Sequence, residues 1–148
     1  MYKHILVPSD GSAISMKAAK TAIRFANSMG ARITAVHILA PYVYQVYGDA
    51  MGYAPISDPK AYKLDSENYA RKILGKVEAV ARRAGVVCRG VSVSSPQVWE
   101  GILKVAKAQS CDAIVMASHG YRGVKGLLLG SETTKVLTHS KLPVLVVR

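Results

Sequence analysis

The chain has 148 residues, of which 50% are hydrophobic and 20% are charged, and this size and composition predict one globular domain over residues 1–148. No apolar run approaches the roughly 20 residues of a membrane helix, and the N-terminal apolar stretch is too short for a signal peptide, so we expect a cytoplasmic protein with no membrane partner. The net charge is +11, but the cations recur at helical spacing and indicate solvated helix faces rather than a nucleic-acid surface.

The first half of the chain predicts two strands and two helices. An apolar run predicts a strand at residues 3–7, and small apolar residues at helical spacing predict a helix over 12–29 that ends at Gly30. A second strand is predicted at 32–39. A long helix within 59–84 is expected to begin between residues 60 and 65 and to end at Gly85. The tyrosine-rich segment 40–59 between them is either a surface loop packed by its own aromatics or a lid or partner surface.

The second half continues the alternation. Strands are predicted at 86–93, 113–117 and 143–147, and helices at 96–109, with Pro96 at the start, and at 131–140. Strands that alternate with helices predict an α/β fold with a parallel sheet and helices on both faces. In such sheets ligands bind beyond the carboxyl ends of the strands, where the strand order reverses. Polar loops follow the first and fourth predicted strands, so both are candidates for the site.

The loop between the fourth strand and the last helix favours a phosphate. It contains four glycines between residues 120 and 130, together with Arg122 and Lys125. Glycine allows close backbone approach, and the first N–H groups of a helix have no intrahelical partner and favour negative charge. Ser131 suits the N-cap position, or its hydroxyl could instead reach a phosphate. The loop therefore predicts binding of a phosphorylated small molecule.

Other motifs narrow the possibilities. The chain contains neither a P-loop nor a dinucleotide fingerprint, so a kinase-like or dehydrogenase-like assignment has no support. Asp10 could accept hydrogen bonds from ribose hydroxyls or cap the first helix, for which Ser12 is also suited. His119 lacks an identifiable partner carboxylate and is expected to have a structural or ligand-contact role. No nucleophile elbow, carboxylate pair or metal cluster is evident, so the sequence indicates a binding site without a catalytic apparatus.

At this point the chain resembles the universal stress protein family, from end to end. The resemblance is carried by six segments, at residues 5–12, 36–38, 116–120, 127–131, 135–137 and 143–147. It implies a Rossmann-like, five-stranded parallel sheet of order 3-2-1-4-5. ATP-binding members carry the pattern G-x-x-G, nine residues, then G-[ST]. Gly120, Gly130 and Ser131 match this pattern, whereas Ala117 stands where the family has its first glycine.

The resemblance also implies the nucleotide-binding residues. Pro8, Ser9 and Asp10 would lie near adenosine, with Asp10 toward ribose, and the backbone of Ile38 would bond the adenine edge. The fourth strand would contribute Met116, Ala117, His119 and Gly120, the last three lining ribose and the α-phosphate. Arg122 would lie in the loop. The outer phosphates, with or without Mg²⁺, would be held by Gly130, Ser131, Glu132 and Thr133, although Glu132 suits this place only if its side chain points away or meets the metal.

Family members pair their last strand across a dimer axis, so residues 143–147 are expected to form a homodimer edge. The resemblance implies an ATP-binding stress-response regulator or adaptor with an unidentified protein partner and at most slow ATP hydrolysis. Two alternatives stay open. One is a dimeric scaffold that needs no nucleotide. The other is a protein that binds AMP or a cyclic nucleotide through the adenosine half of the site alone.

Overall fold

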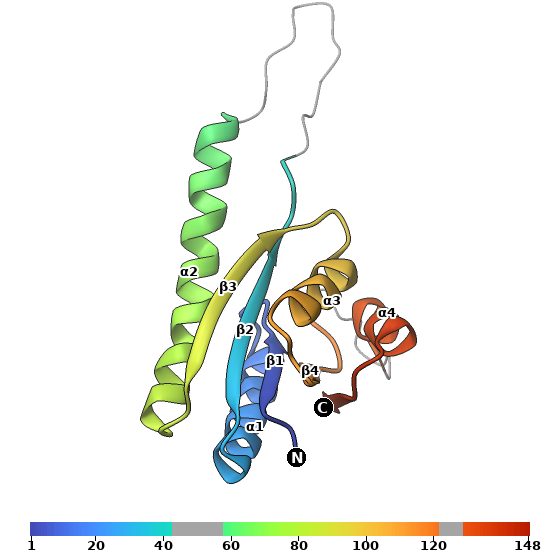
Figure 1. The fold of residues 1–148 in the computed structure, drawn as a ribbon. Coiled ribbons are helices and arrows are strands. Elements are labelled where there is room, and N and C mark those ends of the chain that lie inside the picture. The colour runs from blue at the N-terminus through green and yellow to red at the C-terminus, as the bar shows by residue number, and fades with distance from the viewer. Residues whose placement is uncertain (43–57, 122–128) are drawn as a thin grey trace, which may run out of the picture.

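The computed structural model describes residues 1–42, 58–121 and 129–148, and these residues form five strands and four helices (Figure 1). In chain order the elements are β1 (His4–Pro8), α1 (Ala13–Met29), β2 (Arg32–Leu39), α2 (Pro59–Arg83), β3 (Cys88–Ser94), α3 (Val98–Ala108), β4 (Ala113–Ala117), α4 (Ser131–His139) and β5 (Val144–Val147). Most of the tyrosine-rich segment 40–59 lies outside the described residues, as do 122–128.

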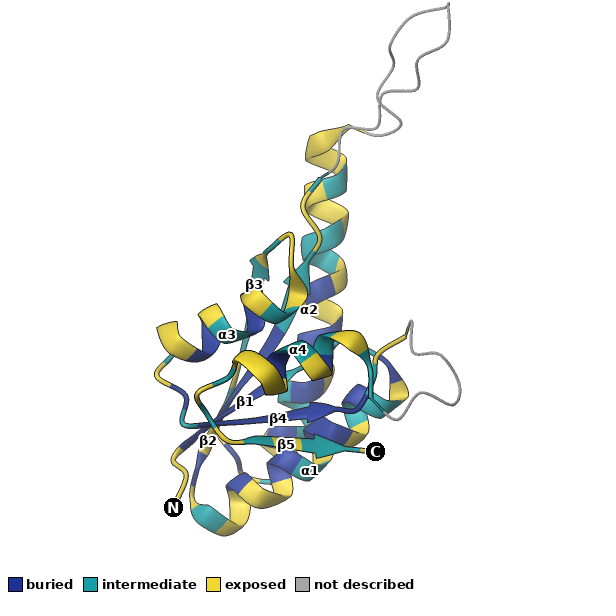
Figure 2. Ribbon diagram, turned by 90° about the vertical axis from the view of Figure 1, so that its right-hand side faces the viewer, coloured by how far each residue is buried: buried dark blue, intermediate teal, exposed yellow. Residues whose placement is uncertain are grey.

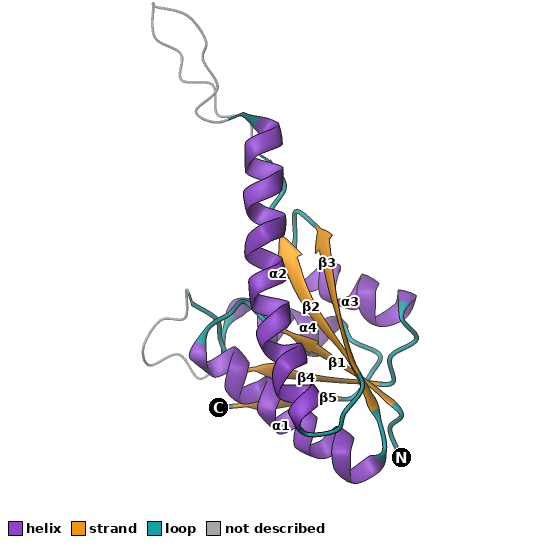
Figure 3. Ribbon diagram, turned by 90° about the vertical axis from the view of Figure 1, so that its left-hand side faces the viewer, coloured by secondary structure: helices purple, strands orange, loops and turns teal. Residues whose placement is uncertain are grey.

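The five strands form one parallel sheet in the order β3-β2-β1-β4-β5, which confirms the predicted fold class and strand order. Helices α1 and α2 cover one face, and α3 and α4 cover the other (Figures 1 and 3). Because β1 and β4 are neighbours while their chains continue to opposite halves of the sheet, the order reverses between them. This reversal places the candidate loops at the point where such folds bind ligands.

Alternation along each strand divides the core into two clusters. In β1, Ile5 and Val7 pack with α1 and α2, whereas Leu6 packs with the α3 and α4 side. The same division holds in β4, where Val115 belongs to the first cluster and Met116 to the second. The central strands are buried on both faces, as Figure 2 shows for β1 and β4. This burial explains why their sequences read as continuous apolar runs.

Several predicted boundaries shift for identifiable reasons. The third strand begins at Cys88, not at residue 86, because the Val86 N–H returns to the Ala81 carbonyl (2.9 Å) and closes the end of α2. Helix α3 begins at Val98, two residues after the predicted start at Pro96. Its Gln97 cap makes no side-chain hydrogen bond; a carboxylate from another helix accepts from its first turn instead, as described below. Helix α1 matches its prediction, with Ser12 as N-cap and Gly30 (φ 64°) as C-cap.

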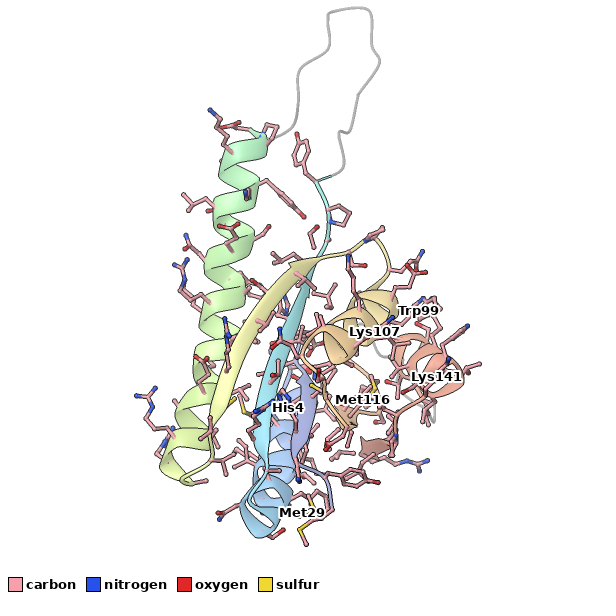
Figure 4. All side chains as sticks on the ribbon, viewed as in Figure 1. His4, Met29, Trp99, Lys107, Met116 and Lys141 are labelled. Carbon is pink, nitrogen blue, oxygen red and sulfur yellow. The ribbon has the colours of Figure 1, made fainter. Side chains whose placement is uncertain are left out.

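Buried His4 couples the stability of the fold to pH. Its Nε2 lies 2.8 Å from the Thr34 hydroxyl, and both side chains are buried. Figure 4 labels His4. Burial, helped by the positive charge of Arg32, lowers the pKa of His4 below 6.5. The neutral ring therefore contributes its full stability above pH 6.5, and this contribution is lost as the pH falls from 6.5 through the lowered folded-state pKa.

We expect His4→Gln, which keeps a partner for Thr34, to flatten the dependence of the melting temperature on pH between about 7 and 5. Equal slopes for the His4 variant and the unmodified chain would contradict the assignment.

Candidate functional site

The candidate site forms where the loops after β1 and β4 meet. These loops, residues 9–12 and 118–130, leave the carboxyl ends of the two neighbouring strands. Two hydrogen bonds join them although more than a hundred residues separate their partners. The Tyr121 N–H donates to Asp10 Oδ2 (2.8 Å), and the Tyr121 hydroxyl donates to the Gly11 carbonyl (3.0 Å).

Asp10 is the polar centre of this junction. Its Oδ1 accepts from the Ser12 N–H (3.0 Å) and the Ser12 hydroxyl (2.6 Å), and its Oδ2 accepts from Tyr121. A carboxylate offers about four acceptor positions, so these three bonds from described residues leave acceptor capacity on Oδ2 for a ligand hydroxyl. Helix α1 is capped by Ser12, whose hydroxyl accepts from the Ser15 N–H (3.2 Å). Of the two roles predicted for Asp10, helix capping is thus performed by Ser12 instead.

The Asp10 carboxylate is held in its charged form. Partial burial raises the pKa of Asp10, but the hydrogen bonds from the Ser12 hydroxyl, the Ser12 N–H and the Tyr121 N–H outweigh burial and bring the pKa below its ordinary value. The group is therefore an acceptor throughout the neutral range and is suited to receive hydroxyl donors, such as those of a ribose.

Gly120 is required at its position by close approach to Asp10. A Cβ added at Gly120 would overlap the Asp10 Oδ2 atom. The glycine thus lets the β4 loop pass over the carboxylate while the following residue, Tyr121, donates to it. The sequence analysis selected Asp10 and Gly120 but missed Tyr121, because no local pattern indicates a contact over 111 positions.

Ser9 anchors the β1 loop to the sheet. Its N–H donates to the Val36 carbonyl (2.9 Å), and its own carbonyl lies 2.8 Å from Nδ1 of His37. Its buried hydroxyl is 3.1 Å from that of Ser15 and accepts from the Gly11 N–H. Ser9 therefore fixes the turn from within, whereas Pro8, the last residue of β1, is half-buried at the strand end.

Ile38 lies beyond the end of its neighbouring strand. The pairing of β1 with β2 ends at Pro8 and Val36, and the Val36 carbonyl points toward β1, where it accepts from Ser9. Backbone groups two residues apart in a parallel strand point to the same side, so those of Ile38 are directed past the end of β1. This orientation suits hydrogen bonding to the edge of a planar base.

Ala117 ends β4 in ordinary backbone geometry. Ser110 is the only non-glycine residue with a positive φ in the described part of the chain, so the conformation at Ala117 is one that alanine adopts without strain. Ala117 is 7% exposed and pairs with Val147 of β5, and its carbonyl accepts from the Thr133 hydroxyl (2.9 Å). The alanine in place of the family glycine is thus compatible with this backbone. Met116 is buried on the α3 side (Figure 4).

The loop is closed next to His119. The Gly130 N–H donates to the Ser118 carbonyl (2.7 Å), which brings the two ends of the loop together. The Ser118 hydroxyl lies 3.0 Å from Nδ1 of His119 and orients the half-buried ring. A Cβ at Gly130 would lie only 3.1 Å from the His119 Cα, so any side chain here would force the backbone at His119 to shift.

The start of α4 corrects one expectation. The N-cap is Gly130, not Ser131, and it provides no side-chain hydrogen bond. Exposed Ser131 is the first helical residue, so its hydroxyl and the first N–H groups of α4 are not used for a side-chain cap. The hydroxyl of Thr133 is committed to Ala117, which leaves only its backbone for a ligand.

Glu132 points away from the loop. Its Oε2 accepts from the Trp99 N–H at the start of α3 (2.9 Å), and its Oε1 pairs with Lys135 (3.2 Å). This arrangement removes the conflict between a carboxylate and a phosphate that the sequence raised. Trp99 also packs against His139, with ring centroids 4.4 Å apart. Arg122 lies outside the described residues and is not placed.

The described residues contain neither a metal-binding cluster nor a membrane-spanning helix. No three His, Cys, Asp or Glu side chains gather there as ligands for a metal ion. No helix among them has the length and apolarity to cross a bilayer.

Comparisons with known proteins show similarity over the whole chain. The model of the universal stress protein family matches residues 1–148. A universal stress protein of Methanocaldococcus jannaschii is 30% identical over all of this chain and 83% of its own length. Two solved structures share the fold. A universal stress protein in complex with cAMP is 22% identical, with a TM-score of 0.74 over 99% of this chain and 97% of its own. One from Archaeoglobus fulgidus in complex with dAMP is 17% identical, with a TM-score of 0.72 over 99% and 98%. The chain belongs to the universal stress protein family.

Proposed function

We propose that this protein binds ATP at the junction of the β1 and β4 loops and acts as a nucleotide-responsive regulator or adaptor in the cytoplasm. The observation that carries the proposal is the charged Asp10, which is hydrogen-bonded to the loop after β4 and keeps acceptor capacity among the described residues. No described side chain caps the N-terminus of α4, the helix that follows this loop. Binding of the nucleotide would change the conformation of a surface that contacts a partner protein, and the loop between β4 and α4 would transmit this change. We propose that residues 1–148 form one domain.

The proposed position of ATP is based on the hydrogen-bonding groups that are available at the site. Ribose donates to Asp10, and adenine bonds the backbone of Ile38. Ser9 and Pro8 form the floor of the turn, and Met116, Ala117, His119 and Gly120 form the opposite side. The phosphates accept from the first N–H groups of α4, at Ser131, Glu132 and Thr133, with Gly130 allowing their approach. The family resemblance is the only reason for assigning Arg122 to the nucleotide site. Mg²⁺, if used, would arrive with the phosphates, since Glu132 is committed to Trp99 and Lys135.

A second candidate function is supported by the relatives. The solved family members in complex with cAMP and dAMP hold adenine monophosphates, which have no outer phosphates to reach α4. Binding of AMP or a cyclic nucleotide would use Asp10 and Ile38 but not Ser131. A scaffold that needs no nucleotide is the third possibility.

Titration calorimetry with ATP, ADP, AMP and cAMP separates these functions. We expect ATP to bind most tightly, with affinity falling as phosphates are removed. Equal affinities for ATP and AMP would exclude the α4 contact, and the absence of heat with all four would leave the scaffold. Mass spectrometry of the supernatant from denatured protein gives an independent readout, since a bound nucleotide would be released there.

Replacement of Ala117 by glycine tests the departure from the family pattern. Because the backbone at Ala117 is already unstrained and its N–H is retained, Ala117→Gly should change ATP affinity by less than about threefold, equivalent to well under 1 kcal/mol. The melting temperature should fall, since glycine within a strand costs about 0.5–1 kcal/mol. A large loss of affinity in calorimetry would instead show that the methyl group contacts the nucleotide.

We also propose a homodimer through β5. This strand is at the edge of the sheet, and its Leu145 is 41% exposed. An apolar edge strand is prone to pair with another chain, and a second β5 across a twofold axis would satisfy it. Light scattering at micromolar concentration should give twice the monomer mass. A monomer mass would contradict this assembly without affecting the nucleotide proposal.

A further inference from the structure

Residues of α1 and α2 line a groove on the face of the sheet that these two helices cover, and exposed cations form its rims. Figure 3 shows the two helices on that face. The volume of the groove is about 600 Å³. The apolar part of its lining comes from Met16, Ala79 and Val80, and Gly75 lies among them. The cations that line it are Lys20 of α1 and, from α2, Arg71, Lys72, Lys76 and Arg83. We refer to it as the basic groove.

Among the described residues, no acidic side chain forms an ion pair with the cations of the basic groove. Helix α1 contains no acidic residue, and residues 68–83 of α2 contain only Glu78. The Glu78 carboxylate is turned to β3, where it accepts from the Gly90 N–H (2.6 Å). The ion pairs formed by the described residues both use lysines outside the groove, Lys63 and Lys135. Much of the net charge of +11 is thus concentrated at one concave place.

The hydrogen bonds made by the groove arginines leave donors free. Arg71 donates from Nη1 to Asn68 (3.1 Å), and Arg83 donates from Nε to the Ala79 carbonyl (3.3 Å). A guanidinium has five N–H donors, so each arginine can still bind a carboxylate. Both contacts are local to α2 and hold the stems of the side chains along the rim.

Gly75 opens the floor of the basic groove. A Cβ at this position would meet no atom within 4 Å, so neither packing nor a positive φ requires glycine there. Glycine within a helix costs stability relative to alanine. Because Gly75 has no side chain, the space between Lys72 and Lys76 stays open, and the apolar floor can be reached from solvent there.

We propose that the basic groove binds an acidic segment of a partner protein, with carboxylates on the cationic rims and an apolar side chain on the floor. A peptide supplies both chemistries at adjacent positions, in the manner of a segment laid into a groove. Single-stranded nucleic acid relies on aromatic stacking platforms, and the described residues that line this groove include no aromatic side chain. The proposal names a partner chemistry for an adaptor but does not depend on nucleotide binding.

The test uses the full-length protein without nucleotide and a fluorescent peptide of glutamates and leucines. Anisotropy should show binding that weakens as salt rises from about 50 to 200 mM. Lys76→Glu should lower the affinity at least tenfold. Lys107→Glu makes the same charge change on α3, which covers the opposite face of the sheet, and should lower it less than about twofold (Figure 4). Equal losses in these two variants would overturn the groove as the binding place.

Gly75→Leu tests the apolar floor separately. Filling it should lower affinity for the glutamate–leucine peptide about tenfold while leaving affinity for oligoglutamate nearly unchanged. The melting temperature should not fall, because leucine favours a helix more than glycine does. Unchanged affinity for the first peptide would overturn the floor contact. Tighter binding of oligothymidine, or of phosphatidylserine vesicles, that is lost in Lys76→Glu would overturn the protein partner in favour of that ligand.

Discussion

Gly130→Val is expected to abolish ATP binding, with a loss of at least a hundredfold, or about 3 kcal/mol. A Cβ at Gly130 would lie 3.1 Å from the His119 Cα and 3.2 Å from the Ser118 carbonyl oxygen, and valine adds two more carbons. The loop would have to open, which breaks the 2.7 Å bond from the Gly130 N–H to Ser118. The N-terminus of α4 would then move away from Asp10. Titration calorimetry measures the loss.

A matched control is available in α2. At Gly75 a Cβ meets nothing within 4 Å, so Gly75→Val introduces the same side chain without a clash and should leave ATP affinity unchanged. Light scattering should give the same mass for both variants, since neither position lies in β5. Retained affinity in Gly130→Val would mean that the phosphates are held elsewhere.

Gly120→Ala should cost both ATP affinity and stability. Its Cβ would overlap Asp10 Oδ2, so the carboxylate must turn away and lose the hydrogen bond from the Tyr121 N–H. We expect at least a tenfold loss of affinity in calorimetry. Urea denaturation should show a fall of about 1.5–3 kcal/mol in the free energy of unfolding, the usual contribution of a hydrogen bond to a charged group.

A double-mutant cycle isolates the contact. In an Asp10→Ala background the overlap is removed, so adding Gly120→Ala should cost less than about 0.5 kcal/mol of unfolding free energy. Additive effects of the two substitutions would show that Gly120 and Asp10 act independently. That outcome would contradict the junction between the β1 and β4 loops.

The order of elements was predictable because its signals are local. Periodicity placed β2 and β4 at the observed residues, and Gly30 marked the end of α1 through its left-handed conformation. The family resemblance added the strand order, which periodicity alone does not provide. The start of α3 was predicted too early, and a distant group acts there: α3 starts at Val98, and its Trp99 N–H donates to Glu132, 33 positions away.

The residues of the candidate site divide in the same way. By itself the sequence determined that a glycine-rich loop and an acidic turn follow two strands of a parallel sheet, because residue type and spacing encode strand, turn and helix end. Only the tertiary structure decided that Gly120 passes over Asp10, that Tyr121 donates to it, and that Glu132 turns to α3. It also gathered the scattered cations of α1 and α2 along one groove. These contacts join positions far apart in the chain, and they exist only when the packing of helices on the sheet brings those positions together.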